Sequence, residues 1–315
     1  MKILYLCNKK TFDTKMSRVR FHSMAAISKI SDLTYSGLGW DNYDSNKTVQ
    51  ENIDKIYNSN LPDIVVAYKP LELKGFCDIK PIKCTRYNEM WDIRRTEKEI
   101  DRSKFDLVIC HHLNDMPHYV KRFPNVKFVN ISHCAEKTIY KDYVEEKIYD
   151  VLLVGAVYHP YPFRVRLHGI IQNNLSKLVK CKILNHPGDH GIPYNQIKGA
   201  ILESYAREIN KSKITLTCSS KYKYRLGKYT EIPMCASLLG ADLPDEDHEF
   251  FSKFMLVLDP KMTNEEIIGK LIEHVKDDDK RNEMIKKGME LNKEYTQEKY
   301  AERFIKNVEE FLRAK

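Results

Sequence analysis

Short apolar runs alternate with helix-like stretches along almost the whole chain, and this alternation restricts the fold more than any other feature. In the first part of the chain, the strand-like runs are residues 2–7, 32–37, 63–68, 81–85, 105–111 and 126–132. Apolar residues at helical spacing lie between some of these runs, over residues 17–30 and 49–57. Strands that alternate with helices form a parallel sheet with helices on both faces. This part of the sequence therefore predicts one doubly wound domain.

The same pattern starts again near residue 150. The strand-like runs are now residues 151–156, 181–185, 214–217, 237–241 and 254–258. The helical patterns occupy residues 164–179, 200–209, 264–277, 279–292 and 297–314. We expect an α/β protein with two doubly wound Rossmann-like domains facing across a cleft, one over residues 1–148 and one over residues 149–296. Ligands of such domains lie beyond the carboxyl ends of the strands, so the loops that follow the strands are the expected sites.

Composition and charge narrow the class of protein. The 315 residues are 42% hydrophobic and 30% charged, which is typical of a globular protein with buried cores. A net charge of +8 suits phosphate-bearing ligands or, at most, peripheral contact with an anionic membrane. The cations are mixed with 44 acidic residues and no nucleic-acid-binding motif occurs, so we expect no nucleic-acid partner. The longest apolar runs, such as residues 151–154, are far too short to span a bilayer.

The N-terminus and the cysteines indicate a cytoplasmic protein. The apolar run within residues 1–7 is too short for a signal peptide and reads as a first strand. The eight cysteines are scattered and no C-x-x-C spacing occurs, so zinc binding and dithiol redox chemistry have little support. We expect reduced cysteines that are mostly buried in the cores.

The stretch 225–236 is the strongest candidate for a binding site. It follows a strand-like run and contains Arg225, Lys228 and Glu231, with a helix expected to begin after Gly227. Free N–H groups at a helix start bind anions together with nearby cations. A carboxylate three residues beyond a lysine lies on the same helix face. The arrangement suits a ligand with phosphate at one end and hydroxyls at the other, such as a nucleotide-sugar; the alternative is a basic surface loop before an ordinary helix.

A second candidate opens the C-terminal domain. Gly155 stands at the end of a strand-like run, where it would let the backbone approach a ligand, and Arg164 begins the next helix. The aromatic and proline residues between these two positions would form a lip. The alternative is a connection stiffened by proline that binds nothing.

In the first domain, titratable side chains follow predicted strands. Glu89 and Asp92 come after the fourth of these strands, and His133 comes after the last. Each is a candidate general base for an acceptor hydroxyl. The alternatives are an ordinary loop for the two carboxylates and a histidine satisfied by loop backbone. His111 and His112 would point to opposite sides of a strand end and would not chelate one ion well, so no metal site is predicted.

Three features of the second half resemble the GT-B glycosyltransferases, and among them the CgeB-like (spore-protein glycosyltransferase-like) group. The first is the run 151–158 followed by an Arg-led helix. The second is the pattern Arg225-x-x-Lys228-x-x-Glu231-Ile-Pro-x-Cys-Ala, and the third is a final helix that contains Glu-Lys-Tyr-Ala-Glu-Arg-Phe. The resemblance covers about residues 150–312, whereas the N-terminal half matches only in its alternation of strands and helices.

The resemblance implies a division of roles. The C-terminal domain would bind the nucleotide-sugar, with Arg225 and Lys228 on the diphosphate and Glu231 on the ribose hydroxyls. Gly155 would lie near the phosphates, and Arg164 is the remaining donor-binding candidate. The final helix, residues 297–315, would cross back to the N-terminal domain, which would serve the acceptor. The family is typically metal-independent, and no Asp-x-Asp follows a predicted strand in this chain.

The sequence also departs from the family. Many retaining members have two Glu residues with seven residues between them, and Lys223 occupies the earlier of these positions relative to Glu231, so retention and inversion both stay open. We predict a metal-independent, hexosyltransferase-type enzyme without a cofactor. It would move a sugar from a UDP- or GDP-sugar, which is its substrate, to a hydroxyl of a glycan, lipid or protein. The alternatives are a non-catalytic module that binds a sugar or nucleotide, and a sugar-nucleotide epimerase of the same fold.

Overall fold

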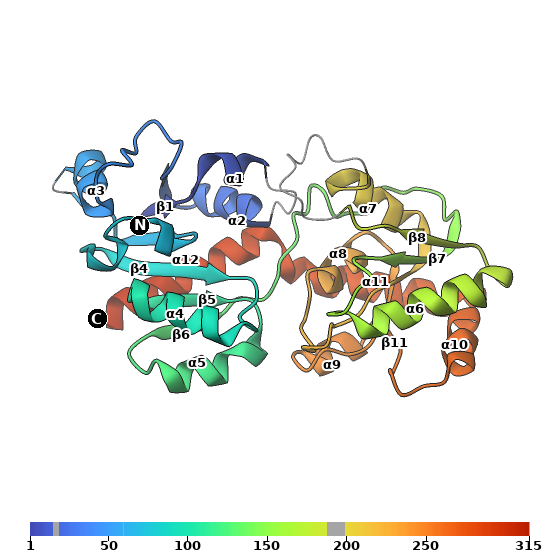
Figure 1. Cartoon of the computed structure of the whole chain (residues 1–315). Coiled ribbons are helices and arrows are strands. Elements are labelled where there is room, and N and C mark those ends of the chain that lie inside the picture. The colour runs from blue at the N-terminus through green and yellow to red at the C-terminus, as the bar shows by residue number, and fades with distance from the viewer. Residues whose placement is uncertain (15–18, 59, 188–198, 315) are drawn as a thin grey trace. The chain divides into compact units, whose positions relative to one another are not determined.

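The computed structural model of the chain describes residues 1–14, 19–58, 60–187 and 199–314, which form two compact units. The first unit consists of Met1–Ser132 together with Gln297–Lys315, and the second consists of His133–Thr296. Each unit is built around one parallel sheet (Figure 1). The prediction of two doubly wound α/β domains is therefore confirmed.

The sheet of the first unit has six parallel strands in the order β2-β1-β3-β4-β5-β6. The strands are β1 (Lys2–Leu6), β2 (Asp32–Ser36), β3 (Ile64–Ala67), β4 (Ile82–Tyr87), β5 (Leu107–Cys110) and β6 (Lys127–Asn130). The chain runs outward from β1 to β2, then returns to place β3 on the other side of β1. The order thus reverses between β1 and β3, and this is the point at which a doubly wound sheet opens a crevice for ligands.

Helices cover this sheet and bury its apolar strands. They are α1 (Lys9–Thr14), α2 (Val19–Ser28), α3 (Val49–Tyr57), α4 (Ile93–Ser103), α5 (Met116–Arg122) and α12 (Gln297–Ala314). Every residue of β3 and β5 is buried, as expected for strands with helices on both faces. The final helix α12 packs on α2 through a face that includes Tyr300, Phe304 and Val308 (Figure 1). The predicted return of this helix to the first domain is confirmed.

The second unit has a five-stranded parallel sheet in the order β11-β10-β9-β7-β8. Its strands are β7 (Tyr149–Val154), β8 (Cys181–Leu184), β9 (Ser212–Leu216), β10 (Leu238–Ala241) and β11 (Leu256–Val257). Its helices are α6 (Pro162–Asn173), α7 (Leu202–Asn210), α8 (Lys228–Met234), α9 (His248–Ser252), α10 (Asn264–Lys276) and α11 (Asp278–Asn292). Here the strand order reverses between β7 and β9, so the crevice lies between the loops that leave these two strands.

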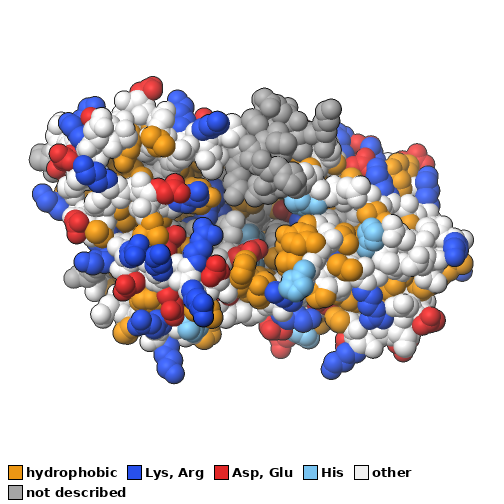
Figure 2. Space-filling model, in the orientation of Figure 1, with side chains coloured by type: hydrophobic (Ala, Val, Ile, Leu, Met, Phe, Trp, Pro, Cys, Tyr) orange, Lys and Arg blue, Asp and Glu red, His pale blue; other side chains and the backbone are white. Residues whose placement is uncertain are grey.

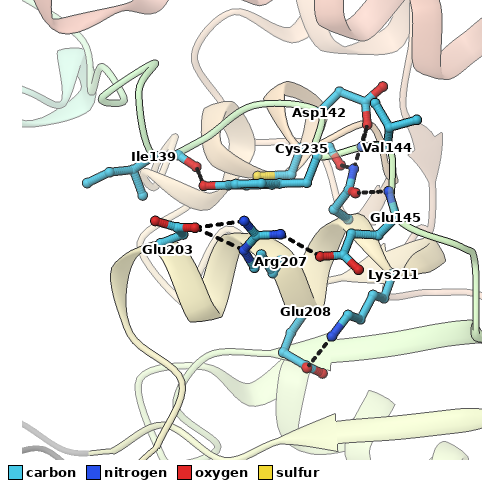
Figure 3. A network of polar contacts seen from close by, with 11 residues as sticks. Ile139, Asp142, Val144, Glu145, Glu203, Arg207, Glu208, Lys211 and Cys235 are labelled. Atoms are coloured by element: carbon cyan, nitrogen blue, oxygen red, sulfur yellow. Dashed lines mark hydrogen bonds and ion pairs between the residues drawn. The ribbon is translucent and has the colours of Figure 1, made fainter.

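The chain passes from the first unit to the second earlier than the sequence suggested. The predicted boundary was 148/149, but the division falls between Ser132 and His133. The charged segment before β7 resembles a linker in sequence, yet its charges are paired with α7 (Figure 3). The Asn210 side chain accepts from Glu145 N–H at 3.0 Å and donates to Asp142 at 2.9 Å, while Arg207 contacts the Glu145 carboxylate at 2.6 Å. These contacts bind the segment to the second unit.

Two further properties concern the apolar character of the helices and the distribution of charge on the surface. None of the helices within the described residues combines the length and the apolar character needed to cross a membrane. On the face seen in Figure 2, Lys and Arg side chains are interspersed with Asp and Glu. The positive net charge is therefore not gathered into one continuous basic surface on that face.

Candidate functional site

Arg164 bridges the crevice of the second unit. It lies on α6, which follows β7, and its Nη2 donates to Thr217 Oγ1 at 2.9 Å and to the carbonyl oxygen of Cys218 at 3.4 Å, just after β9. Its Nη1 donates to the carbonyl oxygen of Ala156 at 2.9 Å. The guanidinium also lies 4.2 Å from the ring centroid of Tyr161. These contacts hold one cation at the point where the strand order reverses.

The charge of Arg164 is buried without a counter-ion. The side chain is 1% exposed, its partners are neutral oxygens, and its Nε has no hydrogen-bond partner. Within the described residues, no carboxylate forms an ion pair with it. A buried charge without an opposite charge is costly, so an anionic ligand in this crevice would be strongly favoured.

Gly155 makes the close packing around Arg164 possible. It directly follows β7 and has a φ of +97°, a backbone conformation that residues other than glycine rarely adopt. A Cβ at this position would lie 2.9 Å from the Arg164 guanidinium and 2.9 Å from Lys228 Cε. The absence of a side chain therefore lets α6 and α8 bring their two cations to the end of the same strand.

Lys228 and Glu231 occupy the first turn of α8. Both side chains are half-buried, and within the described residues neither the ammonium nor the carboxylate has a hydrogen-bond or ion-pair partner. Burial lowers the pKa of Lys228, an effect that Glu231 opposes and Arg164 reinforces. Burial also raises the pKa of Glu231, and Lys228 counteracts that shift. The two groups sense each other's charge but leave their polar atoms available to a ligand.

Two tyrosines stand near the Glu231 carboxylate. The negative charge of Glu231 adds to burial in raising the pKa of Tyr205 and of Tyr140 well above the ordinary value. The Tyr205 hydroxyl is buried and has no hydrogen-bond partner among the described residues, and its ring lies edge-on to Tyr140 with the ring centroids 6.3 Å apart. Both phenols therefore stay protonated, and Tyr205 keeps a donor on this side of the site.

Asp242 fixes the loop that leads into α8. It follows β10 directly and accepts from the Ser219 N–H at 2.9 Å, the Ser219 hydroxyl at 2.5 Å and Lys223 Nζ at 2.8 Å. The Tyr229 hydroxyl donates to its carbonyl oxygen at 2.6 Å. Through its carboxylate and its backbone carbonyl, this one residue ties together the end of β9, the loop and the first turn of α8. The position of Lys228 depends on this anchoring.

Arg225 lies beside the site but its guanidinium is engaged within the protein. It is 0% exposed, its Nη1 contacts the Asp247 carboxylate at 2.6 Å, and its backbone N–H donates to Glu246 at 3.0 Å. The guanidinium is also stacked on Tyr295 at 3.7 Å. The sequence led us to expect a contact with diphosphate, but this environment favours a role in holding the loop.

The two candidate carboxylates of the first unit line a separate cavity. Glu89 and Asp92 lie at the wall of a cavity of about 290 Å³ beyond the carboxyl ends of β3 and β4. The Trp91 indole donates to Glu89 at 3.1 Å, and Asp92 accepts from the backbone N–H of Arg95 at 3.2 Å as the N-cap of α4. Both carboxylates are exposed, so they can meet a ligand in this cavity.

The histidines do not gather at either site. His133 is half-buried and begins the second unit, whereas the sequence had placed it in the first domain. The division between the units lies before His133 because the residues that follow His133 contact α7 of the second unit. His111 and His112 are both buried, and His111 Nδ1 lies 2.7 Å from the carbonyl oxygen of Ile131. Within the described ranges, no three His, Cys, Asp or Glu side chains converge in the manner of metal ligands.

The structure thus brings Gly155, Arg164, Lys228 and Glu231 into one cluster and leaves Arg225 outside it. Sequence reasoning missed several residues that shape the sites: Thr217, Asp242 and Tyr205 in the second unit, and Arg86 in the first. Asp242 carried a usable signal, because it is the first residue after an apolar strand. The other three gave none, since their roles depend on contacts between distant segments.

Comparison with solved structures identifies the fold. The chain matches sucrose-phosphate synthase from Thermosynechococcus elongatus with a TM-score of 0.64 and 11% identity over 99% of both chains. It matches a trehalose-6-phosphate synthase with a TM-score of 0.65 and 9% identity, covering 98% of this chain and 99% of the other. It also matches an α-glucosyltransferase in complex with UDP and DNA, with a TM-score of 0.61 and 12% identity over 98% of both chains. No family model and no curated protein sequence matches the chain.

These likenesses show the fold over nearly the whole chain. The two parallel-sheet units, each taken by itself, and the final helix that returns to the first unit match the GT-B fold of these solved structures. Identities of 9 to 12% do not carry activity or substrate from one protein to another. The narrower resemblance to the CgeB-like group stays a prediction.

The packing at Gly155 yields a test. We expect Gly155→Ala to lower the free energy of unfolding by about 1–3 kcal/mol, because the methyl group would be strained at positive φ and would collide with Arg164. Gly169→Ala is the matched control: this glycine lies inside α6 with open space around it, so alanine should be neutral or stabilising by up to about 1 kcal/mol. Urea-induced unfolding measures both. Equal stability of Gly155→Ala and the wild type would refute the packing argument.

Proposed function

We propose that the protein is a glycosyltransferase that moves a sugar from a nucleotide-diphosphate sugar to an acceptor hydroxyl, and that the second unit binds the donor. The observation that carries the proposal is the cluster at the crevice of that unit. Arg164 has a buried charge without a counter-ion, and Lys228 and Glu231 have no partner within the described residues. Two cations and one carboxylate in this arrangement complement an anionic group joined to hydroxyls.

In the proposed donor complex, Arg164 and Lys228 contact the diphosphate and Glu231 accepts hydrogen bonds from ribose hydroxyls. Gly155 lets Arg164 and Lys228 meet at the end of β7, beside the proposed position of the phosphates. The leaving diphosphate gains negative charge as the glycosidic bond breaks, and fixed cations stabilise that charge without having to reorganise. We propose that these cations make a metal ion unnecessary. Arg225 contributes indirectly by holding the loop before α8.

The proposed reaction exchanges one bond for another. The bond between the anomeric carbon and the diphosphate oxygen breaks, and its electron pair leaves with the nucleoside diphosphate. The acceptor oxygen forms the new bond to the anomeric carbon, and its proton passes to a base. His133, Glu89 and Asp92 are the proposed candidates for that base, and the latter two line the cavity of the first unit.

Two measurements on a donor panel separate the proposal from its alternatives. One of the structural neighbours is described in complex with UDP, so UDP-sugars head a panel that also includes GDP- and ADP-sugars. We expect one of these donors to raise the unfolding temperature and to release nucleoside diphosphate, slowly to water and faster with an acceptor. Binding without any release would indicate a non-catalytic module. Interconversion of the free sugar-nucleotides would indicate an epimerase.

The first prediction from the proposal concerns Lys228. We expect Lys228→Met to weaken the binding of the nucleoside diphosphate about 10- to 100-fold, which corresponds to the loss of one charge-assisted hydrogen bond. The unfolding temperature should be unchanged or higher, because the variant no longer buries part of an ammonium group. Isothermal titration with UDP and GDP measures the affinity. Lys253→Met is the matched control, since Lys253 is an exposed lysine of the same unit. Unchanged affinity in Lys228→Met would remove this residue from the donor site.

The lowered pKa of Lys228 gives a second prediction, on pH. Burial and Arg164 favour the neutral amine in the free site, whereas a bound diphosphate favours the charged form. As the pH rises through the lowered pKa of the free site, binding must take up a proton, and affinity for nucleoside diphosphate should fall at a lower pH than an ordinary lysine would cause. In Lys228→Arg the group stays charged, so the affinity should be flat over the same range. An identical decline in the variant would contradict the assignment.

A third prediction concerns the base. Removing the base should lower turnover by about 10²- to 10⁴-fold while the KM for the donor stays the same. Glu89→Gln, Asp92→Asn and His133→Gln test the candidates in turn, and asparagine at position 92 preserves the cap of α4. Asp101→Asn, an exposed carboxylate on α4 outside the cavity, is the control. Full turnover in all three variants would exclude them.

A further inference from the structure

The cavity of the first unit lies at the point where the strand order of its sheet reverses. Its walls come from α2, which follows β1, from the segment after β3 and from the end of β4. The residues that matter for the argument are Arg20, Tyr68, Arg86, Asn88, Glu89 and Asp92. A volume of about 290 Å³ is at the lower end of the range for small-molecule sites. The cavity therefore has the place and the size of a binding site for a small ligand.

Arg20 presents a cation to this cavity. Its guanidinium is stacked on Tyr68 at 3.5 Å, and its Nη2 donates weakly to the carbonyl oxygen of Arg86 at 3.4 Å. Its Nη1 is buried and has no hydrogen-bond partner within the part of the chain that the structure describes. Burial lowers the pKa of Arg20, and the charge of the nearby Arg86 lowers it further, so a second cation lies close to this one.

Arg86 is the second cation, and a polar network fixes its orientation. It is 6% exposed, its Nη1 donates to Ser23 Oγ at 2.9 Å, and its Nη2 donates to Asn88 Oδ1 at 3.2 Å. Ser23 in turn donates to the Gln297 side chain on α12 at 2.8 Å. The Nε of Arg86 is buried, and none of the described residues forms a hydrogen bond with it. The network positions the guanidinium but supplies no negative charge.

The carboxylates that line the cavity do not neutralise the two arginines. Glu99 accepts from the Tyr87 hydroxyl at 2.7 Å, Glu89 accepts from the Trp91 indole, and Asp92 caps α4. Among the described residues, neither arginine forms an ion pair with a carboxylate. Two neighbouring cations that are buried without an opposite charge destabilise each other and the fold. A ligand with negative charge would relieve this repulsion.

We propose that this cavity binds the anionic group of a polyhydroxylated small molecule, a phosphate or a carboxylate, between Arg20 and Arg86. Guanidinium groups bind both kinds of anion through two parallel N–H donors, so the geometry fits either chemistry. Asn88, Glu89 and Asp92 are available along the same wall for the hydroxyls. That the ligand is the sugar acceptor rests on the proposed function; the binding of an anion in the cavity does not.

The test measures binding in the absence of a donor. Isothermal titration compares glucose 6-phosphate, glucuronate and glucose, which share a ring and differ in the anionic group. We expect at least one of the two anions to bind at least about 10-fold more tightly than glucose. The preference between them identifies the anion as phosphate or carboxylate.

Variants then locate the site. Arg20→Gln should lower the affinity for the preferred anion at least about 10-fold and leave the weak binding of glucose unchanged. Arg86→Lys keeps the positive charge but loses the two parallel N–H donors of the guanidinium, so it should also weaken the binding of the anion. Arg102→Gln, an exposed arginine of α4 outside the cavity, should bind like the wild type. Should Arg86→Lys unfold because of its burial, the half-buried Arg20 still decides the question.

Three results would overturn the inference: no binding of either anion, equal binding of glucose and the anions, or full anion affinity in Arg20→Gln. Failure of the anion site and failure of the proposed transferase function give different results. UDP binding that depends on Lys228, with transfer only to neutral acceptors, would refute the anion site and keep the transferase. Anion binding that depends on Arg20, without any nucleotide binding, would keep this site and refute the donor assignment.

Discussion

An arginine that is at least half-buried, and that pairs with no carboxylate among the described residues, stands at the reversal point of each sheet, and the arrangement of both candidate sites depends on it. At such a point two adjacent strands send their chains in opposite directions, so their carboxyl ends leave a crevice. In the second unit Arg164, from the helix after β7, reaches across to the end of β9. In the first unit Arg20, from the second helix after β1, lies at the end of β3 and is stacked on Tyr68. Tyrosine rings and neutral oxygens hold these cations, which leaves their charge for a ligand.

The rest of each site follows from the need to keep such a cation in place. In the second unit, Gly155 removes the side chain that would displace Arg164, and Asp242 ties the loop after β9 to the first turn of α8. In the first unit, Ser23 and Gln297 orient Arg86 from α2 and α12. The final helix therefore does more than cover the sheet, because one of its side chains supports the wall of the cavity. This gives a physical reason for the return of the chain to the first unit after it has completed the second.

The sequence predicts the local structure well where periodicity decides it. The bounds of α3 and α12 agree with the expected helices, and α8 begins directly after Gly227 as expected. Features decided by contacts between distant segments were not predictable. The charged segment 143–149 reads as the boundary between the two domains, but Asn210 and Arg207 on α7 bind it to the second unit. Arg20 and Arg86 are 66 positions apart, and nothing in the local sequence of either indicates that they share a cavity.

The basic loop before α8 shows why a count of cations is a poor guide to an anion site. Lys223 is paired with Asp242 and Arg225 with Asp247, so the carboxylates that follow β10 neutralise two of the cations that made the loop look like a phosphate site. Lys228 has no such partner, because it lies one helical turn from Glu231 and the two side chains do not form an ion pair. The charge of Lys228 is therefore available to a ligand, whereas the charges of Lys223 and Arg225 are neutralised by the ion pairs that hold the loop. Arg164, Arg20 and Arg86 resemble Lys228 in this respect: each is held by neutral groups, and none has a carboxylate partner among the described residues. Where a fold buries a cation and withholds the opposite charge, the ligand is expected to supply it.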